Sequence, residues 1–137
     1  MANATATEVK DDRRYTKDHE WALEKQPGEL TVGITAFAVD QLGDITLVNL
    51  DVKVGDTVTV GKAFGTIESV KTLSDLFAPV SGKVVKVNQA LEEKPELVNE
   101  DCWGEGWMIV IAPASGAPGS ELVDPEAYRK IIVESAH

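Results

Sequence analysis

Side chains able to act as nucleophiles are scarce in this chain. Cys102 is the only cysteine among 137 residues, so neither an internal disulfide nor a zinc site with two cysteines can form within one chain. It directly follows Asp101, and nearby carboxylates raise the pKa of a thiol rather than lower it. We therefore interpret Cys102 as an ordinary loop cysteine.

Acid–base and metal chemistry has one candidate position. His19 lies between Asp18 and Glu20, a grouping that a catalytic or metal site could use. The second histidine, His137, is terminal, and no third ligand has a helpful spacing. Phosphate-binding glycine motifs and the GxSxG motif are absent from the sequence. We predict no catalytic residue and no metal site, although a small acidic enzyme using these three residues stays an alternative.

One lysine has a distinctive position. Strand-like runs at residues 63–68 and 73–78 flank Lys71, which predicts a lysine at the tip of a β-hairpin. A residue at such a tip is exposed and open to an acylating enzyme. The same placement also suits a solvated lysine in a structural binding module, so geometry alone leaves both interpretations open.

The elements expected around Lys71 are short strands with few helices. Thr35 is a suitable N-cap for a helix over 36–42, with Gly43 at its end, and Asp124 followed by Pro125 predicts a C-terminal helix over about 125–134. A helical turn is expected over 95–99. Further strands are expected at 20–24, 30–34, 44–50, 58–60, 82–87 and 106–111. This pattern predicts a mainly β domain, a small sandwich or barrel.

Composition limits the classes of partner. The chain has 23 acidic against 13 basic residues and a formal charge of −10, which disfavours nucleic acid and anionic membranes as partners. Its length and apolar content predict one domain over residues 15–137, preceded by a flexible leader over residues 1–14. The leader lacks the features of a secretory signal, so we expect a reducing, cytoplasmic setting.

Several sequence blocks together resemble a known family. Gly61 and Gly82 lie ten residues before and eleven after Lys71, as in lipoyl and biotinyl carriers. From about residue 15 to 133 the chain is similar to the H proteins of the glycine cleavage system. The supporting blocks are His19-Glu-Trp, Gly33-Ile-Thr, Leu42-Gly-Asp-Ile, Glu68-Ser-Val-Lys, Ala78-Pro-Val-Ser-Gly, Pro95-Glu-Leu-Val-Asn and Gly104-Glu-Gly-Trp. Leu73, Lys94 and Cys102 depart from the usual residues of the family.

The resemblance implies a fold and a role. The fold would be a barrel-sandwich hybrid of two small antiparallel sheets, with short flanking helices and a C-terminal helix. Lipoic acid would be amide-linked to Lys71, within a recognition turn formed by Glu68, Ser69, Val70 and Thr72. The lipoyl arm would carry an aminomethyl group from glycine decarboxylase (P protein) to the aminomethyltransferase (T protein), and electrons to dihydrolipoamide dehydrogenase (L protein). Such a carrier needs no catalytic residue of its own.

Further expectations concern the arm and the setting. A loaded arm carries a cationic amine, for which Asp18, Glu20 and Asp75 are candidate parking carboxylates. We expect a monomer, cytoplasmic in a bacterium, or in the mitochondrial matrix if the chain is a processed eukaryotic one. A relay of lipoyl groups to other enzymes is a possible second role. Other lipoyl or biotinyl domains are the nearest alternative, but biotin carriers usually flank the lysine with Met, whereas here Val70 and Thr72 flank it.

Overall fold

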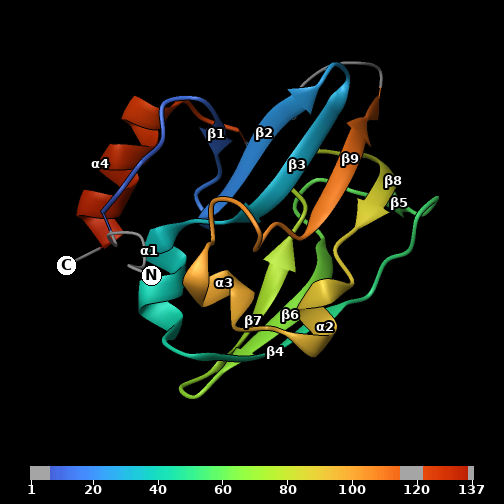
Figure 1. Cartoon of the computed structure of the whole chain (residues 1–137). Helices are drawn as coiled ribbons and strands as arrows, with labels where there is room; N and C mark the ends of the chain where they lie inside the picture. The colour runs from blue at the N-terminus through green and yellow to red at the C-terminus, as the bar shows by residue number, and fades with distance from the viewer. Residues whose placement is uncertain (1–6, 115–121, 136–137) are drawn as a thin grey trace.

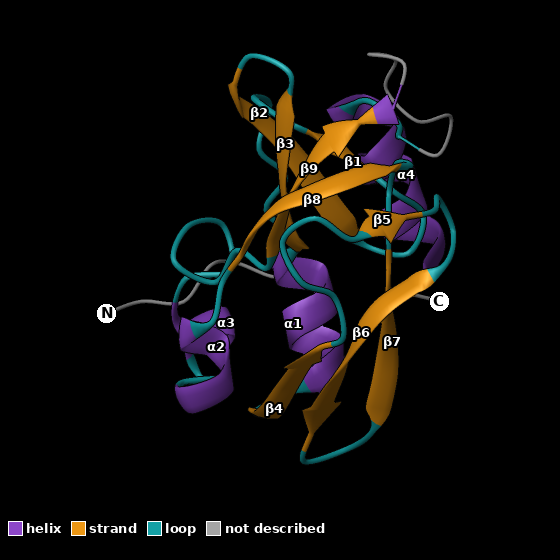
Figure 2. Ribbon diagram, turned by 90° about the vertical axis from the view of Figure 1, so that its right-hand side faces the viewer, coloured by secondary structure: helices purple, strands orange, loops and turns teal. Residues whose placement is uncertain are grey.

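Two antiparallel sheets form the body of the protein in a computed structural model that describes residues 7–114 and 122–135 (Figure 1). The larger sheet has the strand order β1 (Arg14–Tyr15), β2 (Glu20–Gln26), β3 (Glu29–Ile34), β9 (Ile109–Pro113), β8 (Gly82–Val87) and β5 (Thr57–Val58). The smaller sheet has the order β4 (Ile45–Leu50), β6 (Ala63–Ser69) and β7 (Leu73–Phe77). Figure 2 shows the smaller sheet below the larger one, with its β6–β7 hairpin pointing away from it.

In the described residues four helices accompany the sheets: α1 (Ala36–Leu42), α2 (Ala90–Glu93), α3 (Leu97–Glu100) and α4 (Pro125–Ser135). The predicted caps of α1 are confirmed, since the hydroxyl of Thr35 accepts a hydrogen bond from the backbone N–H of Ala38, and Gly43 ends the helix with a φ of 81°. α4 packs beside the N-terminal segment (Figure 1), away from the β6–β7 hairpin. No helix in the described ranges is both long and apolar enough to cross a membrane.

Buried side chains form two clusters. The main core joins the two sheets through residues such as Val32 of β3, Val48 of β4 and Ile67 of β6, each at most 1% exposed. Exposed residues such as Asn49 of β4 and Glu68 of β6 face away from this core, whereas the last four residues of β3 are all buried. A second cluster, named here the aromatic cluster, consists of Tyr15, Trp21, Phe37, Tyr128 and Ile132 and fixes α4 and α1 to the larger sheet.

The predicted fold class is confirmed: the protein is mainly β, with two antiparallel sheets, short helices and a C-terminal helix, although the sheets do not close into a barrel. Several details differ from expectation: β1 was not predicted, β5 is Thr57–Val58 rather than 58–60, and α3 is Leu97–Glu100 rather than 95–99. The turn of helix α2 was not predicted, because its four residues are too few to show a helical period. The last core strand begins at Ile109 rather than residue 106, because the backbone N–H groups of Gly106 and Trp107 bond within the preceding loop.

The flexible leader predicted over residues 1–14 does not extend to Arg13 and Arg14. Arg13 is only 9% exposed and Arg14 begins β1, so neither belongs to a frayed segment. The guanidinium of Arg13 donates to the backbone oxygen of Trp103 and lies 4.7 Å from the ring centre of Trp21. A sequence interpretation based on polarity misses this, because an arginine can bury its stem and place its planar cation over aromatic rings.

Candidate functional site

Lys71 lies at the exposed tip of the β6–β7 hairpin, as predicted. The hydroxyl oxygen of Ser69 accepts hydrogen bonds from the backbone N–H groups of Lys71 and Thr72, both at 3.2 Å. The backbone N–H of Ser69 donates to the oxygen of Thr72 at 2.8 Å, closing the turn. A serine hydroxyl that accepts from the backbone N–H groups two and three residues further along fixes the turn locally, so the lysine is presented on an ordered tip.

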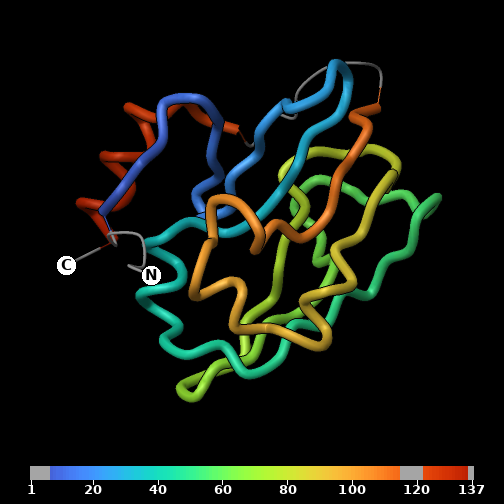
Figure 3. Tube along the Cα trace, in the orientation of Figure 1, coloured from blue at the N-terminus to red at the C-terminus, as the bar shows by residue number. Residues whose placement is uncertain are grey.

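The loop that follows α1 supports the tip. The backbone N–H of Val70 donates to the oxygen of Asp44 at 3.1 Å. Asn99 of α3 holds this loop in place, since its side-chain amide donates to the oxygen of Gly43 at 3.0 Å and its side-chain oxygen accepts from the N–H of Ile45 at 2.9 Å. Figure 3 shows the hairpin tip beside the chain that leaves α1. These supporting residues could not be assigned from sequence, because their partners are distant in the chain.

The stem of Lys71 lies over the end of α1. A β-carbon built on Gly43 would be 3.5 Å from Cε of Lys71, and the positive φ of Gly43 disfavours any larger residue there. The Glu68 and Thr72 side chains are exposed, and Val70 is 67% exposed. Apart from the half-buried Ser69, the predicted recognition residues are therefore open to an incoming enzyme.

A pocket of about 160 Å³ lies between the hairpin and α1, and is named here the arm-side pocket. Its lining includes apolar side chains of both sheets and α1, such as Ile34, Leu42 and Ile67. It also includes Asp18, His19 and Asp75. Two of the three predicted parking carboxylates are thus brought to one pocket from segments 57 residues apart.

Glu20, the third predicted parking residue, is inside the protein. It is 2% exposed; one carboxylate oxygen accepts from the hydroxyl of Thr16 at 2.9 Å and the other from the backbone N–H of Phe77 at 3.0 Å. Burial raises its pKa to about 8, against the effect of both hydrogen bonds. Because both oxygens are engaged and Glu20 does not line the pocket, its structural role is to tie β2 to the end of β7.

The surroundings of Cys102 do not favour a reactive thiol. Cys102 is 3% exposed, and burial, followed by the charge of Asp101, raises its pKa to about 12. This agrees with the interpretation of an inert cysteine, although burial rather than neighbouring acids is the larger cause. Within residues 7–114 and 122–135, no group of three His, Cys, Asp or Glu side chains could hold a metal ion.

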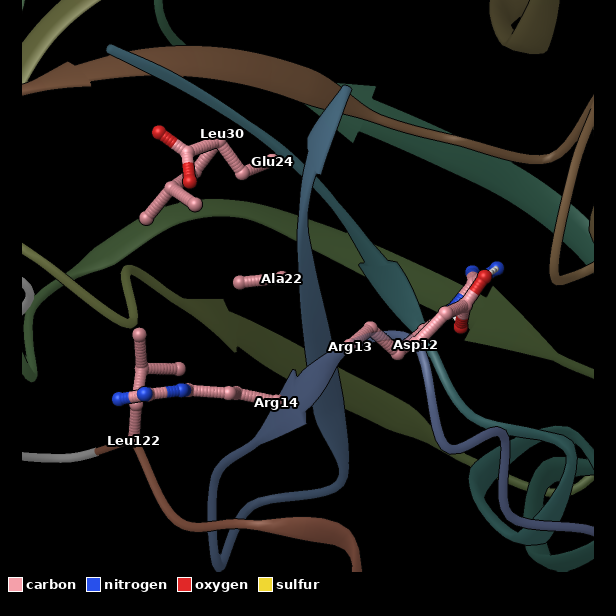
Figure 4. Close-up of a pocket in the computed structure, with 7 residues that line it drawn as sticks. All are labelled: Asp12, Arg13, Arg14, Ala22, Glu24, Leu30 and Leu122. Atoms are coloured by element: carbon pink, nitrogen blue, oxygen red, sulfur yellow. Dashed lines mark hydrogen bonds and ion pairs between the residues drawn. The ribbon is translucent and has the colours of Figure 1, made fainter. Parts of the chain in front are cut away.

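A second pocket, of about 240 Å³, lies beside β1 and β2 (Figure 4). Arg14 and Leu122 lie on one side of β2 in this view, and Asp12 and Arg13 on the other. The cation of Arg13 is already paired with Asp12 at 2.8 Å, and this pocket shares no lining residue with the arm-side pocket. We therefore assign it no part in the site.

The chain is similar to known proteins over most of its length. Residues 13–135 match the sequence profile described as Glycine cleavage H-protein. Glycine cleavage system H proteins of Bacteroides thetaiotaomicron and Thermus thermophilus are 48% and 47% identical to the chain, covering 87% and 94% of it and 93% and 99% of their own lengths. A crystal structure of a glycine cleavage system H protein from Mycobacterium marinum superposes with a TM-score of 0.80 at 36% identity, over 94% of this chain and 100% of that one. The chain belongs to the glycine cleavage H-protein family.

Proposed function

We propose that this protein is the lipoyl carrier of a glycine cleavage system, with lipoic acid amide-linked to Lys71. The observation that carries the proposal is the ordered, exposed tip, on which Ser69 holds the backbone of Lys71 and Asp44 holds that of Val70. Glu68, Ser69, Val70 and Thr72 form the surface that a lipoylating enzyme reads. When bound, lipoic acid supplies a dithiolane that accepts electrons and a one-carbon amine unit.

The residues around Lys71 fit such a group. The apolar lining of the arm-side pocket suits an aliphatic acyl chain, and the stem of Lys71 lies beside Gly43 at the end of α1. An arm of about a dozen bonds reaches roughly 14 Å, so the tip can dock outside a partner while the arm enters it. Acylation also removes the positive charge of the lysine.

The partners in this proposal are the P, T and L proteins of glycine cleavage and a lipoylating enzyme. The net charge of −10 can steer the carrier to basic patches, and such contacts weaken with salt, which suits exchange between partners. We propose a monomer that acts in the bacterial cytoplasm, in line with the bacterial sources of its relatives. A relay of lipoyl groups to other enzymes would use the same hairpin and is a secondary proposal.

The attachment site is tested by intact mass spectrometry after incubation with a lipoate ligase, lipoate and ATP. We expect one lipoyl-sized increment on Lys71 and none in Lys71→Arg, whose free energy of unfolding should change by less than about 0.5 kcal/mol because the residue is exposed. Two further variants, V70K/K71A and T72K/K71A, move the lysine within the turn and should be modified poorly. Efficient lipoylation of either would show that the turn geometry is not read.

We further propose that Asp18 and Asp75 hold the cationic amine of the loaded arm in the arm-side pocket. Both carboxylates are exposed at the rim of the pocket, so water screens each contact with the amine, which is worth about 0.2–1 kcal/mol. Asp18→Asn and Asp75→Asn should shorten the lifetime of the loaded protein, followed as formaldehyde release after removal of the decarboxylase. Asp51→Asn, which changes an exposed acid outside the pocket lining, is the matched control. Unchanged lifetimes in both pocket variants would rule out an acidic parking site.

A further inference from the structure

Three side chains from separate elements form a hydrogen-bonded chain that ends in the arm-side pocket. The hydroxyls of Thr35, the N-cap of α1, and Tyr128 of α4 are 2.7 Å apart. The Tyr128 hydroxyl is also 2.8 Å from Nδ1 of His19. Thr35 and Tyr128 have no exposed surface, whereas His19 is half-buried and lines the pocket. These hydrogen bonds therefore link the C-terminal helix to the wall of the proposed arm site.

The direction of the protons along this chain follows from counting donors. The Thr35 oxygen already accepts the backbone N–H of Ala38, and among the described contacts Tyr128 is the sole acceptor for the Thr35 hydroxyl proton. Thr35 must then donate to Tyr128, so the Tyr128 hydroxyl donates to Nδ1 of His19. Burial raises the pKa of Tyr128, which keeps it protonated as this donor. Nδ1 is thus an acceptor without a proton, and a neutral ring carries its proton on Nε2.

The backbone and the packing of His19 hold the ring in this orientation. Its φ of 69° is the one positive value at a non-glycine residue in the described ranges, a conformation that costs free energy and persists where surrounding contacts enforce it. The ring lies 4.8 Å from that of Phe37 on α1 and 5.7 Å from that of Tyr128. The backbone oxygen of His19 also accepts the N–H of Thr35 at 3.0 Å.

We propose that His19 is a positioning residue of the arm-side pocket. The hydrogen bonds from Thr35 through Tyr128 lock its ring in the neutral Nε2–H form, with no basic nitrogen open to the pocket. Protonation of Nδ1 would reverse the hydrogen bonds that run from Thr35 to His19 and leave the buried Thr35 hydroxyl without an acceptor. These hydrogen bonds therefore oppose a charged ring. Burial acts in the same direction and lowers the pKa of His19, whereas Asp18 opposes it. The other titratable groups near the ring are Glu20 on its own segment, which burial keeps protonated up to about pH 8, and Asp75 on β7, which lines the same pocket.

The consequence, which rests on the proposed function, concerns the loaded arm. The carried unit is lost when its ammonium group gives up a proton and the nitrogen lone pair forms a C=N bond as the C–S bond breaks, with the electron pair leaving on sulfur. Water then adds to the carbon and releases formaldehyde and ammonia. A charged His19 would repel the ammonium group, and a free basic nitrogen would remove its proton. A neutral ring whose Nδ1 accepts a hydrogen bond from Tyr128 does neither, so the carboxylates of Asp18 and Asp75 stay available to bind the amine.

The test of the locked ring is ¹⁵N NMR of the imidazole nitrogens in the unmodified full-length protein. At pH 8, where the ring is neutral, we expect wild-type His19 to show the Nε2–H form alone, which requires no variant. In Tyr128→Phe we expect a mixture of both neutral forms and a ring pKa higher by roughly half to one unit, the equivalent of one lost hydrogen bond. Tyr15→Phe is the matched control, because Tyr15 stacks on Tyr128 at 4.5 Å but bonds only to the backbone of Lys10. An Nδ1–H form in the wild type, or equal effects of both variants, would overturn the proposal.

The proposed protection of the carried aminomethyl unit is tested separately on lipoylated, loaded protein. Formaldehyde should be released about three-fold or more faster from Tyr128→Phe than from wild type and Tyr15→Phe at pH 7. Equal release from all three would overturn the protective role even if the NMR result holds. Failure of the proposed function is distinguishable from both outcomes, because Lys71 of the wild type would then take up no lipoyl group while the ring form could still be measured.

Discussion

Glu20→Gln offers a quantitative test of how the interior supports the β6–β7 hairpin. Glu20 is 2% exposed, forms no ion pair within the described residues, and joins Thr16 to the backbone of Phe77. Burial raises its pKa from an ordinary 4.5 to about 8. Because glutamine has nearly the same shape but does not ionise, the variant isolates the effect of the charge.

The sign of the effect follows from proton binding. Between pH 4.5 and 8 the folded protein holds a proton on Glu20 that the unfolded chain has released, so the free energy of unfolding falls as the pH rises. The contribution is present in full below pH 4.5 and is lost by about pH 8. At roughly 1.4 kcal/mol per pKa unit, the difference of 3.5 units (8 minus 4.5) corresponds to an upper limit on the order of 5 kcal/mol.

Urea unfolding of both proteins at pH 5, 6, 7, 8 and 9 measures this contribution. The free energy of unfolding of the wild type minus that of Glu20→Gln should fall by at least about 2 kcal/mol between pH 5 and 9. Subtracting the variant removes the titration of all other groups that the two proteins share. Glu68→Gln, the same change at an exposed position of β6, should show no such trend. A wild-type-minus-variant difference that stays flat within about 0.5 kcal/mol would refute a raised pKa at Glu20.

Two further changes test the turn and the core. Ser69→Ala removes the acceptor for the N–H groups of Lys71 and Thr72, so the lipoylation rate should fall while stability falls by only about 1 kcal/mol; an unchanged rate in the ligase assay would contradict a role for the ordered tip. Gly33→Ala would place a β-carbon 2.5 Å from the ring of Trp21, and this overpacking should cost about 1–3 kcal/mol in chemical denaturation; a loss below about 0.5 kcal/mol would mean that Trp21 moves freely.

The parts of the fold that could be predicted from sequence depend on local chemistry. Thr35 and Gly43 mark the ends of α1 through capping preferences that act within a few residues, and both were found where predicted. The hairpin around Lys71 follows in the same way from two strand-like runs separated by a short turn. The family resemblance added the function, which no single local pattern carried.

The parts that could not be predicted depend on contacts between distant segments. Asp18, Glu20 and Asp75 looked equivalent as acids in the sequence, yet the fold places two of them at a pocket and buries the third. Glu20, Trp21 and Ala22 are all buried, so the period-two alternation of an ordinary strand could not show that Glu20 lies inside the protein. Arg13 was misjudged for the same reason, since its aromatic partners lie far along the chain.

In the proposed carrier, the buried polar groups would give the mobile arm a fixed starting point. Asn99 fixes the loop beside the tip, Glu20 fixes the far end of β7, and the Thr35–Tyr128 chain fixes His19 at the pocket wall. Each satisfies backbone or side-chain donors that would otherwise be unpaired in the interior, which makes alternative arrangements costly. A carrier that brings its cargo to several active sites gains from this rigidity, because a partner that docks on a defined hairpin meets the arm in one position and orders fewer groups on binding.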